Sequence, residues 1–182
     1  MKIRHGFVSN SSSSSFLVAF DFKPDWEDDL EKMLFGDLED DEKWFNSPYS
    51  SKFRWRNSFI ASIVMKELKH QKPMTKKQMI KEIRSGYFPG FPDFDYNDFE
   101  YANENDTEEE KKRKEIKRNK IFRENDRMLN EAANLCYEEF IKTIPDKSEI
   151  YVFEYSDDYE LGCAMEHGNL FDRFQYLHIS KH

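Results

Sequence analysis

A run of serines near the N-terminus has residue types that could bind an anion. Backbone N–H groups and hydroxyls in a loop before a strand can hold a phosphate, and the positive charge of a nearby arginine would help. No P-loop motif is present, and no glycine lies within the run, so a solvated serine linker is the alternative. The ligand-binding candidates are Arg4, Ser9, Asn10, Ser11, Ser12, Ser13, Ser14 and Ser15.

A second group of reactive side chains lies near the C-terminus. Glu166 and His167 could supply an acid and a base, and His178 and His182 have a spacing that metal ligands often use. On a strand that ends in a tail, this spacing does not place both rings on one face, so we expect no metal site. The alternative to a functional cluster is a histidine in a hairpin followed by a mobile C-terminal tail. The catalytic candidates are Ser11, Ser13, Glu166, His167 and His178. No G-x-S-x-G elbow activates a serine, so the sequence assigns neither a reaction nor a cofactor.

An aromatic–acidic stretch, residues 87–101, and a basic stretch, residues 52–84, could contact partners. Clustered aromatic side chains often anchor a protein partner, although such a loop can equally fold onto the core. The partner-binding candidates are Tyr87, Phe88, Phe91, Phe94 and Tyr96. The basic stretch, which includes Trp55, could grip nucleic acid, but the net charge of −8 opposes this reading.

Charge is arranged in blocks along the chain. Residues 93–110 contain nine acids and no base, whereas residues 111–127 contain nine bases and three acids. Such blocks could neutralise each other within the fold or form separate surfaces for partners. The two cysteines, Cys136 and Cys163, have no disulfide-scaffold pattern, and the apolar runs are too short for a signal peptide or a membrane span. We therefore expect a cytoplasmic protein without a membrane partner.

The elements predicted around these residues make a single α+β domain over residues 1–182. Period-two patterns and apolar runs predict strands at 15–22, 149–155, 160–167 and 174–179, the second and third of these forming a hairpin. Helical periodicity and two capping boxes, at Thr75 and Thr107, predict a helical insertion over about 24–144. We expect a small antiparallel sheet of N-terminal and C-terminal strands, with the helices packed on one face.

Both ends of the chain resemble those of a group of uncharacterised phage, prophage and bacterial proteins. The N-terminal residues Lys2 to Phe16 match the signature K-x-R-x-G-F-V-S-N-S-S-S-S-S-F, and residues 153–157, 166–168 and 178–182 resemble the other end of the pattern. The resemblance implies a shared sheet and a shared site, but no reaction, and it does not extend to the helical middle.

Two functions follow from these features as hypotheses. The first is a binding or regulatory protein of phage or prophage type that contacts a macromolecule, with a protein such as a host or defence factor as the expected partner. The second is a small enzyme or ligand-binding domain with an anion site where the serine run meets the Glu166 and His167 pair. The first requires a broad exposed charged or aromatic patch, and the second requires these groups to converge in a pocket.

Overall fold

Strand β1 (Ser13–Phe20) is the middle strand of a three-stranded antiparallel sheet. The computed structural model describes residues 13–39, 43–94 and 100–181. On one side β1 pairs along its whole length with β4 (Glu149–Ser156), and on the other it pairs with β5 (Tyr176–Ser180). The predicted α+β fold, in which the N-terminal strand joins C-terminal strands around a helical middle, is confirmed.

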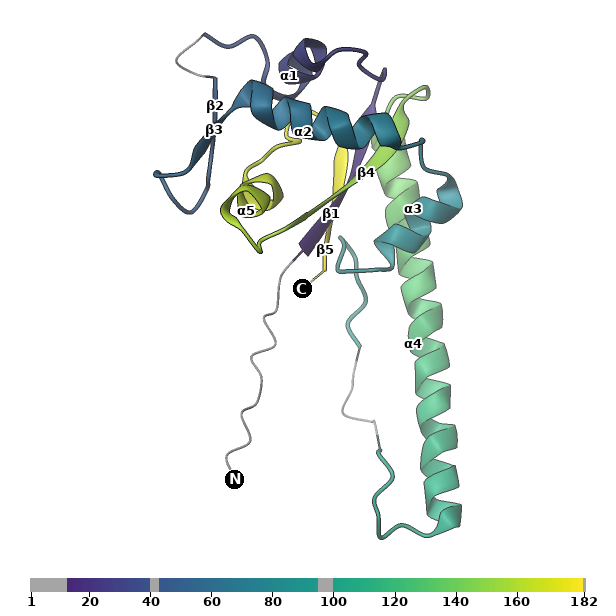
Figure 1. Ribbon diagram of the computed structural model, residues 1–182. Coiled ribbons are helices and arrows are strands. Elements are labelled where there is room, and N and C mark those ends of the chain that lie inside the picture. The colour runs from purple at the N-terminus through teal and green to yellow at the C-terminus, as the bar shows by residue number, and fades with distance from the viewer. Residues whose placement is uncertain (1–12, 40–42, 95–99, 182) are drawn as a thin grey trace, which may run out of the picture.

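Helices cover both faces of this sheet, not the single face expected from the sequence (Figure 1). Phe16, Val18 and Phe20 pack against α1 (Glu27–Phe35), α2 (Asn57–His70) and α5 (Glu160–His167). Leu17 and Ala19 point the other way and pack against α3 (Lys76–Ile83) and α4 (Glu108–Thr143). The reason is visible in β1 itself, because a strand that is apolar at every position from 16 to 20 must bury both of its faces.

The predicted hairpin between strands at 149–155 and 160–167 is wrong, because residues 160–167 form helix α5. The chain turns directly from β4 into this helix, and the N–H of Cys163 donates to the carbonyl oxygen of Tyr159. Gly162 permits the turn: a Cβ atom there would lie 2.1 Å from the carbonyl oxygen of Ser156. Ala164 and Met165 then pack into the core. A short apolar run is compatible with either element, and here tertiary packing selects the helix.

Two of the other helices begin where the capping boxes predict. Thr75 and Thr107 both form complete capping boxes, at the starts of α3 and α4. Gly36 ends α1 with a positive φ of 84°, a conformation that favours glycine. A short ribbon of β2 (Trp44–Asn46) and β3 (Arg54–Arg56) was not predicted.

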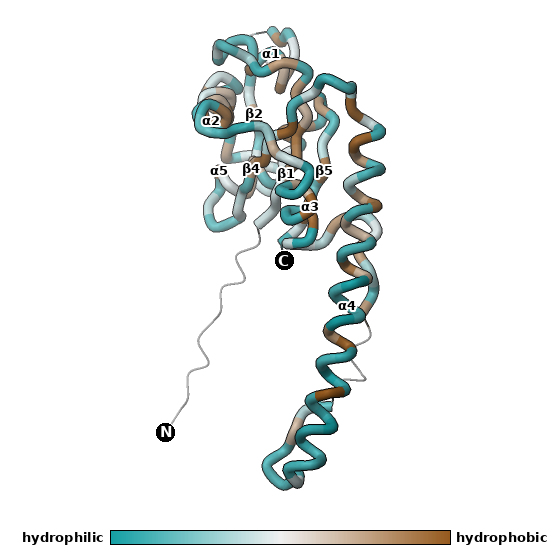
Figure 2. The backbone as a smooth tube through the Cα atoms, turned by 90° about the vertical axis from the view of Figure 1, so that its right-hand side faces the viewer, coloured by the Kyte–Doolittle hydropathy of each residue, from teal (hydrophilic) through white to brown (hydrophobic). Residues whose placement is uncertain are grey.

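Helix α4 is long enough to extend well beyond the sheet (Figure 1). Its C-terminal part is anchored in the core by Ala133, Cys136 and Phe140, whereas no residue of its first 25 is buried. Figure 2 shows this projecting part as mainly hydrophilic with isolated hydrophobic positions. Within the described ranges, no helix has the length and apolar character needed to cross a membrane.

Candidate functional site

The described serines belong to β1 and not to a loop before it. Ser14 and Ser15 are fully buried, and their hydroxyls point to opposite faces of the sheet because strand side chains alternate. Ser14 donates to Glu166 Oε1 at 2.8 Å, across 152 residues of sequence, and Ser15 donates to Glu82 Oε1 at 2.7 Å. These two hydroxyls therefore bind carboxylates, and an anion at the same place would be repelled. Ser13 is half-buried, and the remaining candidates, Arg4, Ser9, Asn10, Ser11 and Ser12, lie outside the described residues.

The glutamate on the α3 and α4 side of the sheet has a cationic partner. Lys181 Nζ lies 2.9 Å from Glu82 Oε1 and 3.1 Å from Glu154 Oε1. Burial by itself raises the pKa of Glu82, but hydrogen bonds from Lys181, Ser15 and Ser85, together with the charge of Lys181, outweigh burial and lower it. In the folded protein, the carboxylate of Glu82 thus has both hydrogen-bond donors and a cationic partner.

The glutamate on the α5 side lines a cavity of about 210 Å³. The side chain of Glu166 has no solvent exposure, and its second oxygen, Oε2, accepts no hydrogen bond from any described residue. His167 Nε2 is the nearby cationic candidate, but it lies 3.6 Å from Oε2, beyond hydrogen-bonding distance. The cavity is lined by Phe16, Glu166, His167, Asn169, Leu170, Phe171, Tyr176 and His178.

The structure therefore brings together much of the predicted C-terminal cluster. Ser14, Glu166, His167 and His178 surround or adjoin one cavity, and the ring of His178 stacks on Phe16 with centroids 4.9 Å apart. Ser14 is not placed as a nucleophile beside a base, because its buried hydroxyl donates to a carboxylate, and no serine is among the described residues that line the cavity. Among the described residues, no three His, Cys, Asp or Glu side chains are grouped so that they could hold a metal ion.

In the first part of the aromatic segment, residues 87–94, two of the rings are folded onto the protein, which is the alternative to a partner-binding loop. Phe88 is buried in the core between the sheet and α4, and Phe91 packs against that core and against the rings of Tyr87, Phe88 and Phe94. Tyr87 remains 56% exposed, and its backbone forms a two-bond bridge with Ser180 at the edge of the sheet. Tyr96 lies outside the described residues.

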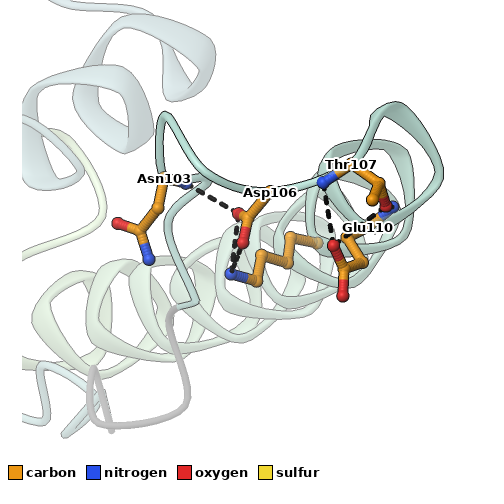
Figure 3. Close-up of polar contacts among 5 residues, drawn as sticks. Asn103, Asp106, Thr107 and Glu110 are labelled. Atoms are coloured by element: carbon orange, nitrogen blue, oxygen red, sulfur yellow. Dashed lines mark hydrogen bonds and ion pairs between the residues drawn. The ribbon is translucent and has the colours of Figure 1, made fainter.

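The acidic block that follows pairs in part with the basic block of α4. We call the described residues 84–94 and 100–107, between α3 and α4, the connecting segment. Asp106 binds Lys114 at 2.8 Å and Glu100 binds Lys117 at 2.6 Å. The hydrogen bond from Lys114, followed by that from the N–H of Asn103, lowers the pKa of Asp106. Figure 3 shows Asn103 and Asp106 beside the Thr107–Glu110 capping box at the start of α4.

One face of the projecting part of α4 is left uncovered by this segment. Arg113, Ile116, Lys120, Arg123 and Arg127, which we call the basic stripe, are all exposed. They follow one another at steps of three, four, three and four residues, which keeps side chains on one face of a helix. Ile116, between Arg113 and Lys120, is 63% exposed. The sequence analysis noted the basic block and missed the stripe, although the spacing was a signal that could have revealed it.

In the basic stretch 52–84, two arginines contact an aromatic ring. Arg54 and Arg56 lie over the ring of Trp44, each with its guanidinium carbon 4.4 Å from the ring centroid. Trp55, between them in the sequence, packs partly against the core. Both arginines therefore stabilise the β2–β3 ribbon by cation–π contacts.

Comparison with known proteins gives no family for this chain. No protein-family model matches it, and neither a curated protein nor a solved structure is similar to it. The resemblance of its two ends to phage and prophage proteins stays a prediction.

Proposed function

We propose that this protein acts by binding an acidic protein partner on the basic stripe of α4. The observation that carries the proposal is a row of four exposed cations and one exposed isoleucine on one face of a helix that projects from the folded body. Lys120 and Arg123 form no ion pair with any described residue, and Arg127 is paired only with glutamates of its own helix. Exposed charges in such a row attract and orient a partner of opposite charge.

The size and rigidity of the stripe suit a helical or extended protein segment. At a rise of about 1.5 Å per residue, the 14 steps from Arg113 to Arg127 span about 21 Å, or four helical turns. The same helix is fixed in the core by Phe140 and Cys136, and the Lys114 and Lys117 ion pairs brace its other end. A braced helix loses little conformational entropy when it binds, which favours affinity.

A protein partner fits these features better than a nucleic acid does. The chain carries a net charge of −8, so a polyanionic backbone is repelled by most of the molecule. Ile116, between Arg113 and Lys120 in the stripe, is a contact for an apolar side chain of the partner, and arginine is enriched at protein–protein hot spots. If the ends of the chain do belong with phage and prophage proteins, the partner is a host or defence factor.

Site-specific photo-crosslinking in cells tests the proposal. A benzoylphenylalanine replacing Asn119, an exposed residue in the groove beside Ile116 and Lys120, should crosslink one discrete protein whose crosslinked peptide is acidic. The same probe replacing Tyr159, an exposed aromatic residue that precedes α5, should not capture that protein.

Matched charge reversals separate the stripe from general electrostatics. Lys120→Glu with Arg123→Glu should abolish the Asn119 crosslink, whereas Lys66→Glu with Lys77→Glu, the same charge change within the basic stretch 52–84, should leave it intact. The proposal would be contradicted if the Asn119 probe crosslinked RNA or DNA in place of protein, or if both double variants reduced the crosslink equally.

A further inference from the structure

Two buried serines next to each other in β1 each bind a glutamate, yet only Glu82 pairs with a lysine, whereas the nearest described basic group to Glu166 is His167 Nε2, 3.6 Å from Oε2. Glu82 accepts from Ser15 and Ser85 and pairs with Lys181. Glu166 accepts from Ser14 alone, and its Oε2 atom has no hydrogen-bond partner among the described residues. A buried carboxylate without a partner for one oxygen is costly, and such atoms are rare in folded proteins.

The environment of Glu166 adds negative potential instead of compensating it. Glu166 lies in the last turn of α5, where the helix dipole places partial negative charge. The chain leaves the helix through Gly168 and Asn169, and Asn169, with a φ of 58°, contributes to the cavity wall. The free carboxylate oxygen and the helix terminus therefore favour a cation in this cavity.

We propose that the cavity binds a small organic cation, a guanidinium or an alkylammonium group, whose N–H donates to Glu166 Oε2. The bound group would be the counter-ion of Glu166, as Lys181 Nζ is the counter-ion of Glu82 on the other face of the sheet. This proposal is independent of partner binding by α4, because the cavity lies beside α5 and β5 and contains no residue of α4.

The lining of the cavity selects an organic cation over a metal ion. Glu166 is the one carboxylate among its described lining residues, whereas hard divalent cations take several oxygen ligands. Rings from Phe16, Phe171 and Tyr176 form much of the wall, and aromatic faces attract guanidinium and ammonium groups. A volume of about 210 Å³ is equivalent to about seven water molecules at about 30 Å³ each, which is enough for one such group.

The exposed rim of the cavity provides a route for the ligand. Asn169, Tyr176 and His178 are exposed, whereas Glu166, Leu170 and Phe171 are buried beneath them. The cation can therefore be a free small molecule or the end of an arginine or lysine side chain in a peptide. Both sources present the same N–H donors to Glu166 Oε2.

Titrations followed by NMR of the His167 and His178 ring signals test the proposal. Methylguanidinium should cause saturable shifts of these signals, and neutral N-methylurea, which has a similar shape, should bind about tenfold more weakly or worse. Acetyl-Gly-Arg-Gly-amide tests the peptide source: tighter binding than methylguanidinium assigns the cavity to an arginine side chain, and weaker binding assigns it to a free cation.

The two glutamates supply a matched pair of variants. Glu166→Gln should weaken methylguanidinium binding about tenfold or more, while Glu82→Gln, which removes the corresponding charge on the other face, should leave it unchanged. Equal binding of methylguanidinium and N-methylurea to the parent protein, or the absence of saturable shifts, would overturn the proposal even if Glu166→Gln fails to fold. Unchanged binding by a folded Glu166→Gln variant would overturn it as well.

Discussion

Replacing Lys181 with methionine removes the counter-ion that Glu82 shares with the exposed Glu154, and it keeps an unbranched side chain at this position. The lysine side chain is 20% exposed and that of Glu82 is 23% exposed, so the pair is intermediate between a surface ion pair and a buried one. Surface pairs contribute about 0–1 kcal/mol, and removal of one partner from a fully buried pair costs about 3–5 kcal/mol. We expect Lys181→Met to lower the free energy of unfolding by about 1–2 kcal/mol at pH 7, which lowers the Tm by about 2–8 °C for a domain of this size.

The free energy of unfolding that is lost in Lys181→Met should be smaller at low pH than at pH 7. The folded-state pKa of Glu82 lies below its ordinary value of 4.5, so as the pH falls the unfolded chain takes up this proton first. The stabilisation by the pair is therefore fully present above pH 4.5 and is lost as the pH falls through the folded-state pKa. In the variant, burial remains without the lysine, so the pKa of Glu82 should rise.

Urea unfolding of the parent and the variant at pH 7 and at about pH 3 measures this effect. The difference between the two proteins should shrink by more than half at the lower pH, because a protonated Glu82 needs no counter-ion. Lys147→Met, at an exposed position, is the control and should differ from the parent by less than about 0.5 kcal/mol. An equal loss at both pH values would refute the reasoning and assign the effect to packing of the lysine stem.

Two further predictions concern the core. Val18→Asp places an unpaired charge at a fully buried position of β1 and should lower the free energy of unfolding by about 4 kcal/mol or more. Leu135→Asp, at a 60% exposed position, is the control and should change this free energy little. Chemical denaturation of the two variants and the parent measures the difference. Burial raises the pKa of Cys136 to about 11. In a Cys163→Ala variant, which removes the more exposed thiol, Cys136 should therefore react with Ellman's reagent only slowly in the folded protein and rapidly in urea. Fast reaction of this folded variant would show that this part of α4 is not packed as described.

Local patterns were sufficient to predict the three strands of the main sheet and the starts of two helices. The apolar run 16–20 indicated β1, and the T-x-x-Q and T-x-x-E patterns located the starts of α3 and α4. These signals are local, because capping and burial of an apolar run depend on a few neighbouring residues. The partial pairing of the acidic and basic blocks was also anticipated as one of two alternatives.

The errors arose where tertiary contacts decide the local structure. Residues 160–167 have an apolar run that fits a strand or a helix, and packing of Ala164 and Met165 against the sheet favours the helix. The strands β2 and β3 have three residues each, too few for a periodic pattern, and their arginines stack on Trp44. In both cases the deciding contacts come from elsewhere in the chain.

The candidate sites show the same division. The sequence indicated that serines, Glu166, His167 and His178 could share a site, and the structure places Ser14 and three of the cavity-lining side chains together. It could not indicate that Ser14 and Ser15 bind different glutamates on opposite faces, because that depends on α3 and α5 covering the two sides of β1. Around Ser14, the predicted anion site is instead occupied by a carboxylate of the protein itself, that of Glu166.

The most direct test of the proposed function is a charge-swap measurement with the protein captured at Asn119. Its affinity for the parent chain should weaken as salt increases, and Lys120→Glu with Arg123→Glu should weaken it by about tenfold or more. Replacing the facing acidic residues of the partner with lysine should restore binding to the reversed stripe but not to the parent. An affinity that does not change with salt concentration or with charge reversal in the basic stripe would contradict the claim that this face of α4 is the docking surface.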